Sequence, residues 1–391
     1  MKNTFTRTRY TWLAYGLLSF YGYFLNILGP LTPFLRNELN LSYTVSSYHF
    51  SAFAVGIIAV GLVGGAVIRR LGRRRALWLG AAGLSVGGLL LMTGRTPVVT
   101  VGASLLMGAL GSFIIVVVSS SLSDQFGQLR AVAYSEANVM ASLISALAGL
   151  TVGYFARTGL GWRGALGLGI AAAPLLWLVF GREAVPEAPG LKNGAAHARL
   201  PVLYWMYWTA LMLVVAVEFC MVFWAAEYLE SELGLPRADA ALASSVFLAG
   251  MLVGRWLSSR VVMRFTAPRV LNVSLLLAAM GYLLYWQAPM PAAGLTGLFV
   301  CGLGVAGLYP LILAQALSTT TDSDAASARA TLASGTAILL LPLLLGRLAD
   351  SLGLRTAYGL VIFLLVGAFI LLAVARQQTI KMETLRSQRL K

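Results

Sequence analysis

The chain alternates between long apolar runs and short polar segments over its 391 residues. A helix needs about 20 mostly apolar residues to cross the hydrocarbon core of a bilayer. The run 270–321 contains no Asp, Glu, Lys or Arg and is too long for one such helix, and the proline-containing segment 288–291 divides it in two. The pattern therefore predicts twelve membrane-spanning helices, near 10–35, 47–68, 76–94, 97–120, 133–156, 164–181, 202–228, 241–259, 270–287, 293–317, 331–346 and 357–375.

Composition and charge fix the class of protein and its orientation. A chain that is 59% hydrophobic and 11% charged, with a mean hydropathy of +0.80, is not a soluble domain. On the layout above, 21 of the 29 Lys and Arg residues lie on the side of the N-terminus and 7 on the opposite side. Because basic loops are retained in the cytoplasm, this predicts a multi-pass protein of the cell (inner) membrane with both termini cytoplasmic. Topology and attraction to anionic membrane lipid explain the net charge of +15, so no nucleic-acid partner is expected.

One long connection divides the predicted helices into two sets of six. This segment, 182–201, is rich in proline, glycine and charge, as is typical of a linker. The end of helix five is also similar in sequence to the end of helix eleven. The segment that begins at Gly153 aligns with the one that begins at Gly346 with one gap. We predict an all-α integral membrane protein with twelve transmembrane helices in two pseudo-symmetric six-helix bundles. Its predicted parts are an N-terminal bundle (1–181), a cytoplasmic linker (182–201), a C-terminal bundle (202–375) and a basic cytoplasmic tail (376–391).

The loop between the second and third helices carries the most specific motif. Five of the seven residues from Arg69 to Arg75 are arginine, which cannot lie within hydrocarbon. From Gly65 to Arg74 the residues Gly-Ala-Val-Ile-Arg-Arg-Leu-Gly-Arg-Arg resemble the loop between helices 2 and 3 of the major facilitator superfamily, whose usual form is Gly-x-Leu-Ala-Asp-Arg-x-Gly-Arg-Arg. The chain departs from this form at Arg69, which stands at the aspartate position of the family.

The resemblance to this superfamily covers essentially the whole chain. It implies a secondary transporter that works by alternating access, with its substrate site between two bundles. Helix seven (218–229), part of helix eight (252–255) and helix ten (302–310) are similar to the fucose-permease branch, which is known for proton-coupled sugar uptake. The chain departs from that branch in two ways: Gly29 stands where a proton-carrying aspartate is expected, and helix four has no acidic residue.

The carboxyl group of Glu218 is the first candidate for the chemistry of transport. Glu218 lies near the middle of helix seven, after the apolar residues 213–217. Charged groups are costly within hydrocarbon, so an ionisable residue there is a functional hypothesis by default. We expect Glu218 either to carry the coupling proton or to bind substrate, and the alternative is a structural carboxylate bonded to a neighbouring helix.

Other polar and aromatic groups within the predicted helices are further candidates. Glu136 is a second candidate for proton coupling. The alternative is that this carboxylate, near a helix N-terminus, only stabilises the positive end of the helix dipole. On helix one, Tyr23 and Asn26 share a polar face. This face either binds substrate or forms hydrogen bonds to neighbouring helices. The predicted substrate-binding residues are Tyr23, Asn26, Asn138, Glu218, Phe219, Tyr309 and Gln315.

The exchanged charge at Arg69 suggests an inverted conformational latch. In the family pattern, the aspartate at this place engages the start of helix eleven, and here that segment contains Asp322 and Asp324. We predict that Arg69 or Arg73 pairs with one of these aspartates, and the alternative is that all of these charges are simply solvated. The predicted latch residues are Gly65, Arg69, Arg70, Gly72, Arg73, Asp322 and Asp324.

These patterns lead to one function with an alternative. We predict a carrier for a small polar solute, with a sugar as the leading class, coupled to protons; export of amphipathic drugs or lipids is the alternative. A sensor or scaffold without flux is a third reading. The sequence has no constellation of nucleophile, base and metal ligands, so we predict no enzyme activity, no catalytic residue, no metal and no cofactor. The architecture needs no partner subunit, so a monomer is expected.

Overall fold

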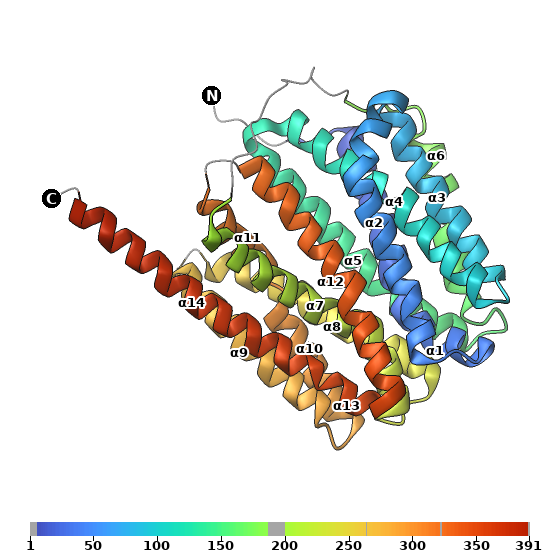
Figure 1. Ribbon diagram of the computed structural model, residues 1–391. Helices are drawn as coiled ribbons and strands as arrows, with labels where there is room; N and C mark the ends of the chain where they lie inside the picture. Colours follow the sequence, from blue (N-terminus) through green and yellow to red (C-terminus); the bar gives the residue numbers. More distant parts are fainter. Residues whose placement is uncertain (1–5, 187–199, 263, 321–322, 390–391) are drawn as a thin grey trace. The chain divides into compact units, whose positions relative to one another are not determined.

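The computed structural model describes residues 6–186, 200–262, 264–320 and 323–389, and these residues form helices and connecting turns without a strand (Figure 1). In chain order the helices are α1 (Arg9–Leu39), α2 (Tyr43–Leu71), α3 (Arg73–Thr93), α4 (Pro97–Phe126), η1 (Gly127–Leu129), α5 (Arg130–Ala156), α6 (Arg163–Phe180), α7 (Val202–Ser231), α8 (Arg237–Val261), α9 (Ala267–Trp286), α10 (Pro291–Val305), α11 (Leu308–Ser318), α12 (Ser323–Leu352), α13 (Leu354–Tyr358) and α14 (Leu360–Arg389).

The lengths of these helices confirm a multi-pass membrane protein of the all-α class. Among the described residues, eleven helical segments are long and apolar enough to cross a bilayer, with α10 and α11 counted as one and α13 and α14 as another. Helix α1 is not one of the eleven, although its 31 residues exceed the length needed. The polar face predicted on this helix lowers its hydropathy, and most of its length is buried against other helices. Each of the twelve predicted spans thus coincides with one helix or with two consecutive helices.

The chain divides into two compact units. The first contains Met1–Asn193 and Val222–Leu248, and the second contains Gly194–Met221 and Ala249–Lys391. The second half of α7 and the first half of α8 therefore pack within the first unit. The sequence-based boundaries at 181, 201 and 375 stay predictions.

Small residues let the helices of the first unit approach closely. Helix α4 packs against both α2 and α3, and α1 packs along α5. At the contact of α2 with α4, a Cβ atom on Gly108 would come within 2.1 Å of the carbonyl oxygen of Phe53. A Cβ atom on Gly56 would meet the backbone nitrogen of Ala109 at 2.2 Å. Because lipid supplies no hydrophobic drive between helices, this close contact of backbones is what holds α2 against α4.

Replacing Gly108 with leucine should therefore force α2 and α4 apart. We expect the free energy of unfolding in detergent to fall by about 3 kcal/mol, because the atoms in the way belong to the backbone and cannot rotate aside. Gly102→Leu is the matched control in the same helix, since a Cβ atom there meets nothing within 4 Å. Thermal unfolding of both variants checks this, and equal midpoints would contradict the close contact.

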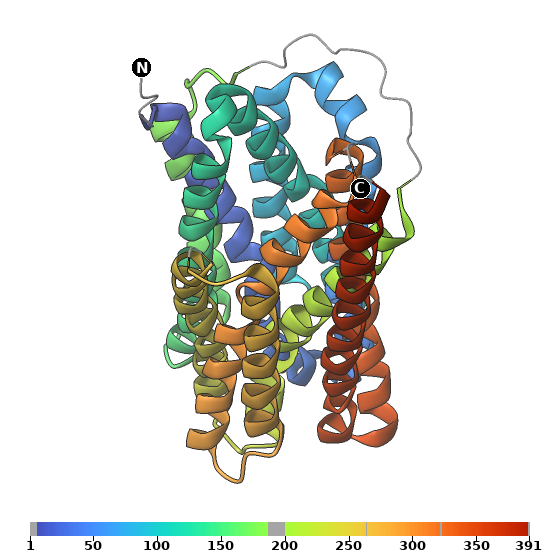
Figure 2. The same ribbon diagram turned by 90° about the vertical axis from the view of Figure 1, so that its left-hand side faces the viewer.

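Glycine also allows close packing of helices in the second unit. Helices α9 and α10 run side by side, joined by a short turn (Figure 2). Gly281 of α9 lies against the backbone of α10, where a Cβ atom would be 2.2 Å from the nitrogen of Cys301. The hydroxyl group of Tyr282 donates to the carbonyl of Tyr358 at 2.5 Å, which fixes α13 beside α9.

The two similar segments, which begin at Gly153 and Gly346, each contain a turn at a glycine. Gly161, before α6, has a φ angle of +60°, and Gly353, before α13, has a φ angle of +82°. Only glycine adopts such angles without strain. Each glycine is followed two residues later by an arginine, Arg163 or Arg355. The aligned segments therefore end in the same kind of glycine turn.

Candidate functional site

An ion pair lies within the spans of the second unit. Glu218 is near the middle of α7, and its side chain is 19% exposed. Nη2 of Arg255, on α8, lies 3.9 Å from Oε1 of Glu218. The sequence predicted either a functional role for Glu218 or a structural bond to a neighbouring helix, and it did not identify Arg255 of α8 as the partner. Opposite charges at this depth lower the cost that each would have alone in hydrocarbon.

Buried tyrosines fix α7 next to Glu218. The hydroxyl group of Tyr358 donates to the carbonyl of Cys220 at 3.3 Å. Cys220 is a free, fully buried cysteine, as is Cys301. Phe219, the neighbour of Glu218, is partly exposed.

The predicted residues of helix ten lie beyond a break in that helix. Helix α10 ends at Val305, and α11 begins at Leu308, so the break precedes Pro310. Tyr309 and Gln315 lie on α11 and are partly exposed. The interruption follows Gly302 and Gly304.

In the first unit, Glu136 of α5 is held by two groups from the start of the chain. The guanidinium group of Arg7 donates to both oxygens of Glu136, at 2.7 and 2.8 Å, and the hydroxyl group of Tyr15 donates at 3.0 Å. Asn138 lies one half-turn further along α5 and donates to the carbonyl of Tyr134 at 2.8 Å. Glu136 is thus bound to groups outside its own helix, which the sequence did not foresee.

The polar groups of α1 form hydrogen bonds within the first unit. The hydroxyl group of Tyr23, a residue 6% exposed, lies 2.8 Å from Oγ1 of Thr151 on α5 and donates to the carbonyl of Ala165 on α6, also at 2.8 Å. Asn26 is partly exposed and donates to the carbonyl of Gly22 at 2.8 Å. Tyr23 therefore makes the hydrogen bonds between helices that were the stated alternative to a substrate role.

A small hollow, whose lining surface is mostly apolar, lies between α4 and α5 in the first unit. It measures about 270 Å³. Its walls combine hydroxyl groups, one guanidinium and one apolar side chain, from Ser119, Leu122, Ser123, Arg130 and Tyr134. Sequence reasoning missed this hollow, although the run of three serines, 119–121, in an apolar helix was a signal for it.

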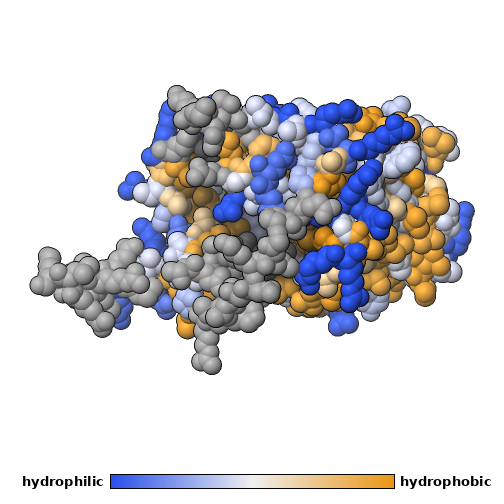
Figure 3. Space-filling model, turned by 90° about the horizontal axis from the view of Figure 1, so that it is seen from above, coloured by the Kyte–Doolittle hydropathy of each residue, from blue (hydrophilic) through white to orange (hydrophobic). Residues whose placement is uncertain are grey.

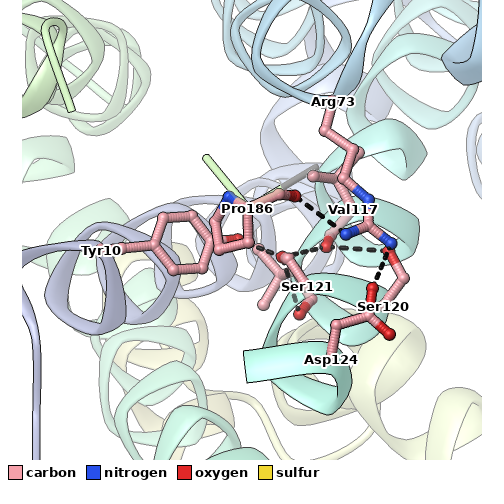
Figure 4. A network of polar contacts seen from close by, with 8 residues as sticks. Tyr10, Arg73, Val117, Ser120, Ser121, Asp124 and Pro186 are labelled. Atoms are coloured by element: carbon pink, nitrogen blue, oxygen red, sulfur yellow. Dashed lines mark hydrogen bonds and ion pairs between the residues drawn. The ribbon is translucent and has the colours of Figure 1, made fainter. Parts of the chain in front are cut away.

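The arginine that opens α3 belongs to a polar network (Figure 4). Nη2 of Arg73 lies 2.7 Å from Oδ2 of Asp124, and its Nη1 donates to the carbonyl of Pro186 at 2.9 Å. One turn before Asp124, the hydroxyl group of Ser121 is hydrogen-bonded to that of Tyr10. The network ties α1, α3 and α4 to the segment that follows α6. Arg73 therefore has an acidic partner within its own unit.

The remaining latch residues are only partly described. Asp322 lies outside the described residues, as does the side chain of Asp324, so the charge-exchanged latch stays a prediction. Among the described residues, Arg69 and Arg70 have no carboxylate within ion-pair distance. The other latch residues of this unit lie on the last turns of α2 and at its C-cap: Gly65, Arg69, Arg70 and Gly72.

An ion pair near the C-terminal end of α1 is the most buried one in the described part of the chain. Glu227 of α7 is fully buried, and its Oε1 lies 2.6 Å from Nη2 of Arg36 on α1. The guanidinium of Arg36 also stacks 4.6 Å from the ring centre of Tyr43 on α2. Nearby, the rings of Phe50 and Phe223 stack with centroids 4.1 Å apart. These contacts join α1, α2 and the second half of α7 within the first unit.

The position expected to hold an aspartate is also part of this contact. A Cβ atom on Gly29 would lie 2.2 Å from the carbonyl oxygen of Val222 and 3.0 Å from the Cα atom of Phe223. The backbone of α7 therefore fills the space in which a side chain at residue 29 would stand.

A family model with the description Major Facilitator Superfamily matches residues 13–330 and 207–388. The chain belongs to this superfamily. It is thereby classed among membrane transporters rather than enzymes, as the basic loop predicted.

Known proteins of similar sequence or fold agree with this family. The chain is 27% identical over 169 residues to a Bacillus subtilis (strain 168) protein described as "Putative metabolite transport protein YwtG". That match covers 43% of this chain and spans only 36% of the relative. Among solved structures, a D-xylose-proton symporter has a TM-score of 0.71 at 18% identity, covering 93% of this chain and 96% of the symporter.

Two further solved structures have the same fold. The outward conformation of the transporter FucP has a TM-score of 0.62 at 15% identity, covering 94% of this chain and 98% of FucP. A bacterial homologue of the human lysosomal transporter Spinster, in an inward-facing conformation, has a TM-score of 0.71 at 18% identity, covering 94% and 96% of the two chains. At these identities the likeness concerns the fold alone.

Proposed function

We propose that this superfamily member is a secondary active transporter that moves a small polar solute, with a sugar as the leading class, by proton-coupled alternating access. We place it in the cell (inner) membrane, as a monomer with both termini in the cytoplasm. The observation that carries the proposal is the Glu218–Arg255 pair within the spans of α7 and α8. Ionisable residues at membrane depth mark substrate and proton pathways.

The geometry of this pair supports a role in coupling. At 3.9 Å the two groups attract each other without a short hydrogen bond. A proton that neutralises Glu218 would weaken the attraction to Arg255, and a solute hydroxyl group could then bond to the guanidinium. Proton binding and solute binding would thereby influence one another, which is what coupling requires.

A few polar groups at the mostly apolar hollow between α4 and α5 support a hydroxyl-rich solute. The hollow between α4 and α5 offers Ser119, Ser123, Tyr134 and Arg130 as donors and acceptors. Hydroxyl groups of a sugar both donate and accept, so they suit such a mixed set. The resemblance of helix seven to the fucose-permease branch points to the same class of solute.

Flux in sealed proteoliposomes tests the proposal. Purified protein would be reconstituted and supplied with a panel of labelled pentoses, hexoses and nucleosides under an inward proton gradient. We expect saturable accumulation of one polar solute, abolished by a protonophore. No flux of any polar solute, together with proton-driven movement of amphipathic dyes, would overturn the proposal and favour the exporter.

A further inference from the structure

A groove in the first unit shares no residue with the proposed transport site. It is bounded by the turn between α2 and α3 and by the end of α6, and it measures about 550 Å³. Two arginines and two tryptophans line it, namely Arg74, Arg75, Trp78 and Trp177. Figure 3 shows the end of the molecule seen from above in Figure 1, where hydrophilic residues adjoin hydrophobic ones.

The positive charge of the groove is not neutralised by a carboxylate in the described part of the chain. Arg74 donates to the carbonyl of Gly181 at the end of α6, and both residues line the groove. Arg75 is exposed and has no acidic group within ion-pair distance among the described residues. Guanidinium groups bind phosphate with two parallel hydrogen bonds, so this pair favours a phosphate-bearing ligand.

The tryptophans and their surroundings indicate where such a ligand comes from. Trp177 is 58% exposed, and the adjacent Leu178 is 72% exposed. Both belong to α6, one of the membrane-crossing helices, so their exposed apolar surface faces lipid chains. The Nε1–H group of Trp78 is buried and lacks an acceptor among the described residues, and a ligand oxygen would supply one. Tryptophan is also enriched at the depth of lipid headgroups.

The geometry points to a binding site for the phosphate headgroup of an anionic phospholipid, held by Arg74 and Arg75 with its acyl chains along α6. A free anion would gain nothing from the exposed apolar surface beside the groove, whereas a lipid would cover it. Basic pockets between helices at a membrane surface suit anionic headgroups. The ligand would hold the α2–α3 turn against the end of α6.

Binding of phosphatidylglycerol to the full chain in detergent tests this inference. The apparent Kd would be measured from the rise in thermal unfolding midpoint, with phosphatidylcholine and inorganic phosphate titrated in parallel. We expect phosphatidylglycerol to bind several-fold more tightly than either. Arg75→Gln should weaken binding about fivefold, and Arg74→Gln with Arg75→Gln about 25-fold, because an arginine near an anionic lipid surface contributes about 1 kcal/mol.

Arg70→Gln is the matched control. It removes the same charge from the same turn but does not line the groove. We expect Arg70→Gln to leave the Kd for phosphatidylglycerol unchanged. An equal loss in Arg70→Gln and Arg75→Gln would overturn the site in favour of diffuse charge attraction. Equal stabilisation by inorganic phosphate would overturn the lipid headgroup. Arg75→Gln without lipid should unfold at the wild-type midpoint, which separates loss of binding from loss of folding.

Discussion

Glu218→Gln should abolish proton-driven accumulation of the solute. With one proton per solute molecule, a gradient of about one pH unit supports up to about tenfold accumulation. Glutamine keeps the size and hydrogen-bonding capacity of the side chain but cannot take up a proton. The coupling free energy is then lost, and the inside-to-outside ratio should fall to about one. Uptake into proteoliposomes under an imposed gradient measures this ratio.

Solute exchange without a gradient separates the two roles proposed for Glu218. If the residue only carries the proton, labelled solute should still exchange with unlabelled solute in Glu218→Gln, whereas exchange is lost if Glu218 binds the solute. Glu230→Gln is the control on the same helix, because Glu230 pairs with Arg237 near the end of α7. Wild-type accumulation with wild-type pH dependence in Glu218→Gln would remove the residue from both roles.

Arg36→Met should destabilise the protein strongly. The change leaves the carboxylate of Glu227 fully buried without its 2.6 Å partner. Removing one member of a buried ion pair typically costs about 3–5 kcal/mol. Glu227→Met should cost less, because the side chain of Arg36 is 32% exposed and water can solvate the charge that remains. Chemical unfolding in detergent measures both changes.

The double variant makes this prediction specific. An apolar pair can replace a buried ion pair at little cost, so Arg36→Met with Glu227→Met should recover most of the stability lost in Arg36→Met. Arg157→Met is the control, because Arg157 and Asp239 form an exposed pair, typically worth about 1 kcal/mol or less. Additive losses in the double variant would show that the two residues act independently.

The helices were predictable from the sequence for a physical reason. A span in hydrocarbon must be long, apolar and internally hydrogen-bonded. Each span can therefore be recognised from its own residues alone. Even so, helix α1 falls below the hydropathy of the other spans, because it is buried by neighbouring helices and carries polar groups on that face. The packing at Gly108 is likewise invisible in the sequence, since it depends on which backbone lies opposite.

The partners of the candidate residues could not be predicted in the same way. Glu218 stood out because one acidic residue interrupts an apolar run, a local signal. Its pairing with Arg255 depends on how α7 and α8 are rotated about their axes, which no local pattern records. The same holds for Glu136 with Arg7 and for Glu227 with Arg36, where residues far apart in the sequence meet.

The glycine at residue 29 constrains how this chain can change. The fucose-permease branch is expected to carry a proton-carrying aspartate at this place, but here the carbonyl oxygen of Val222 on α7 lies within 2.2 Å of where a Cβ atom would be. An aspartate introduced alone would have to push two helices apart before it could serve any purpose. Substitutions that move the backbone of α7 away from residue 29 must therefore come before the change of Gly29 to aspartate. In the reverse order, the intermediate would be a destabilised protein.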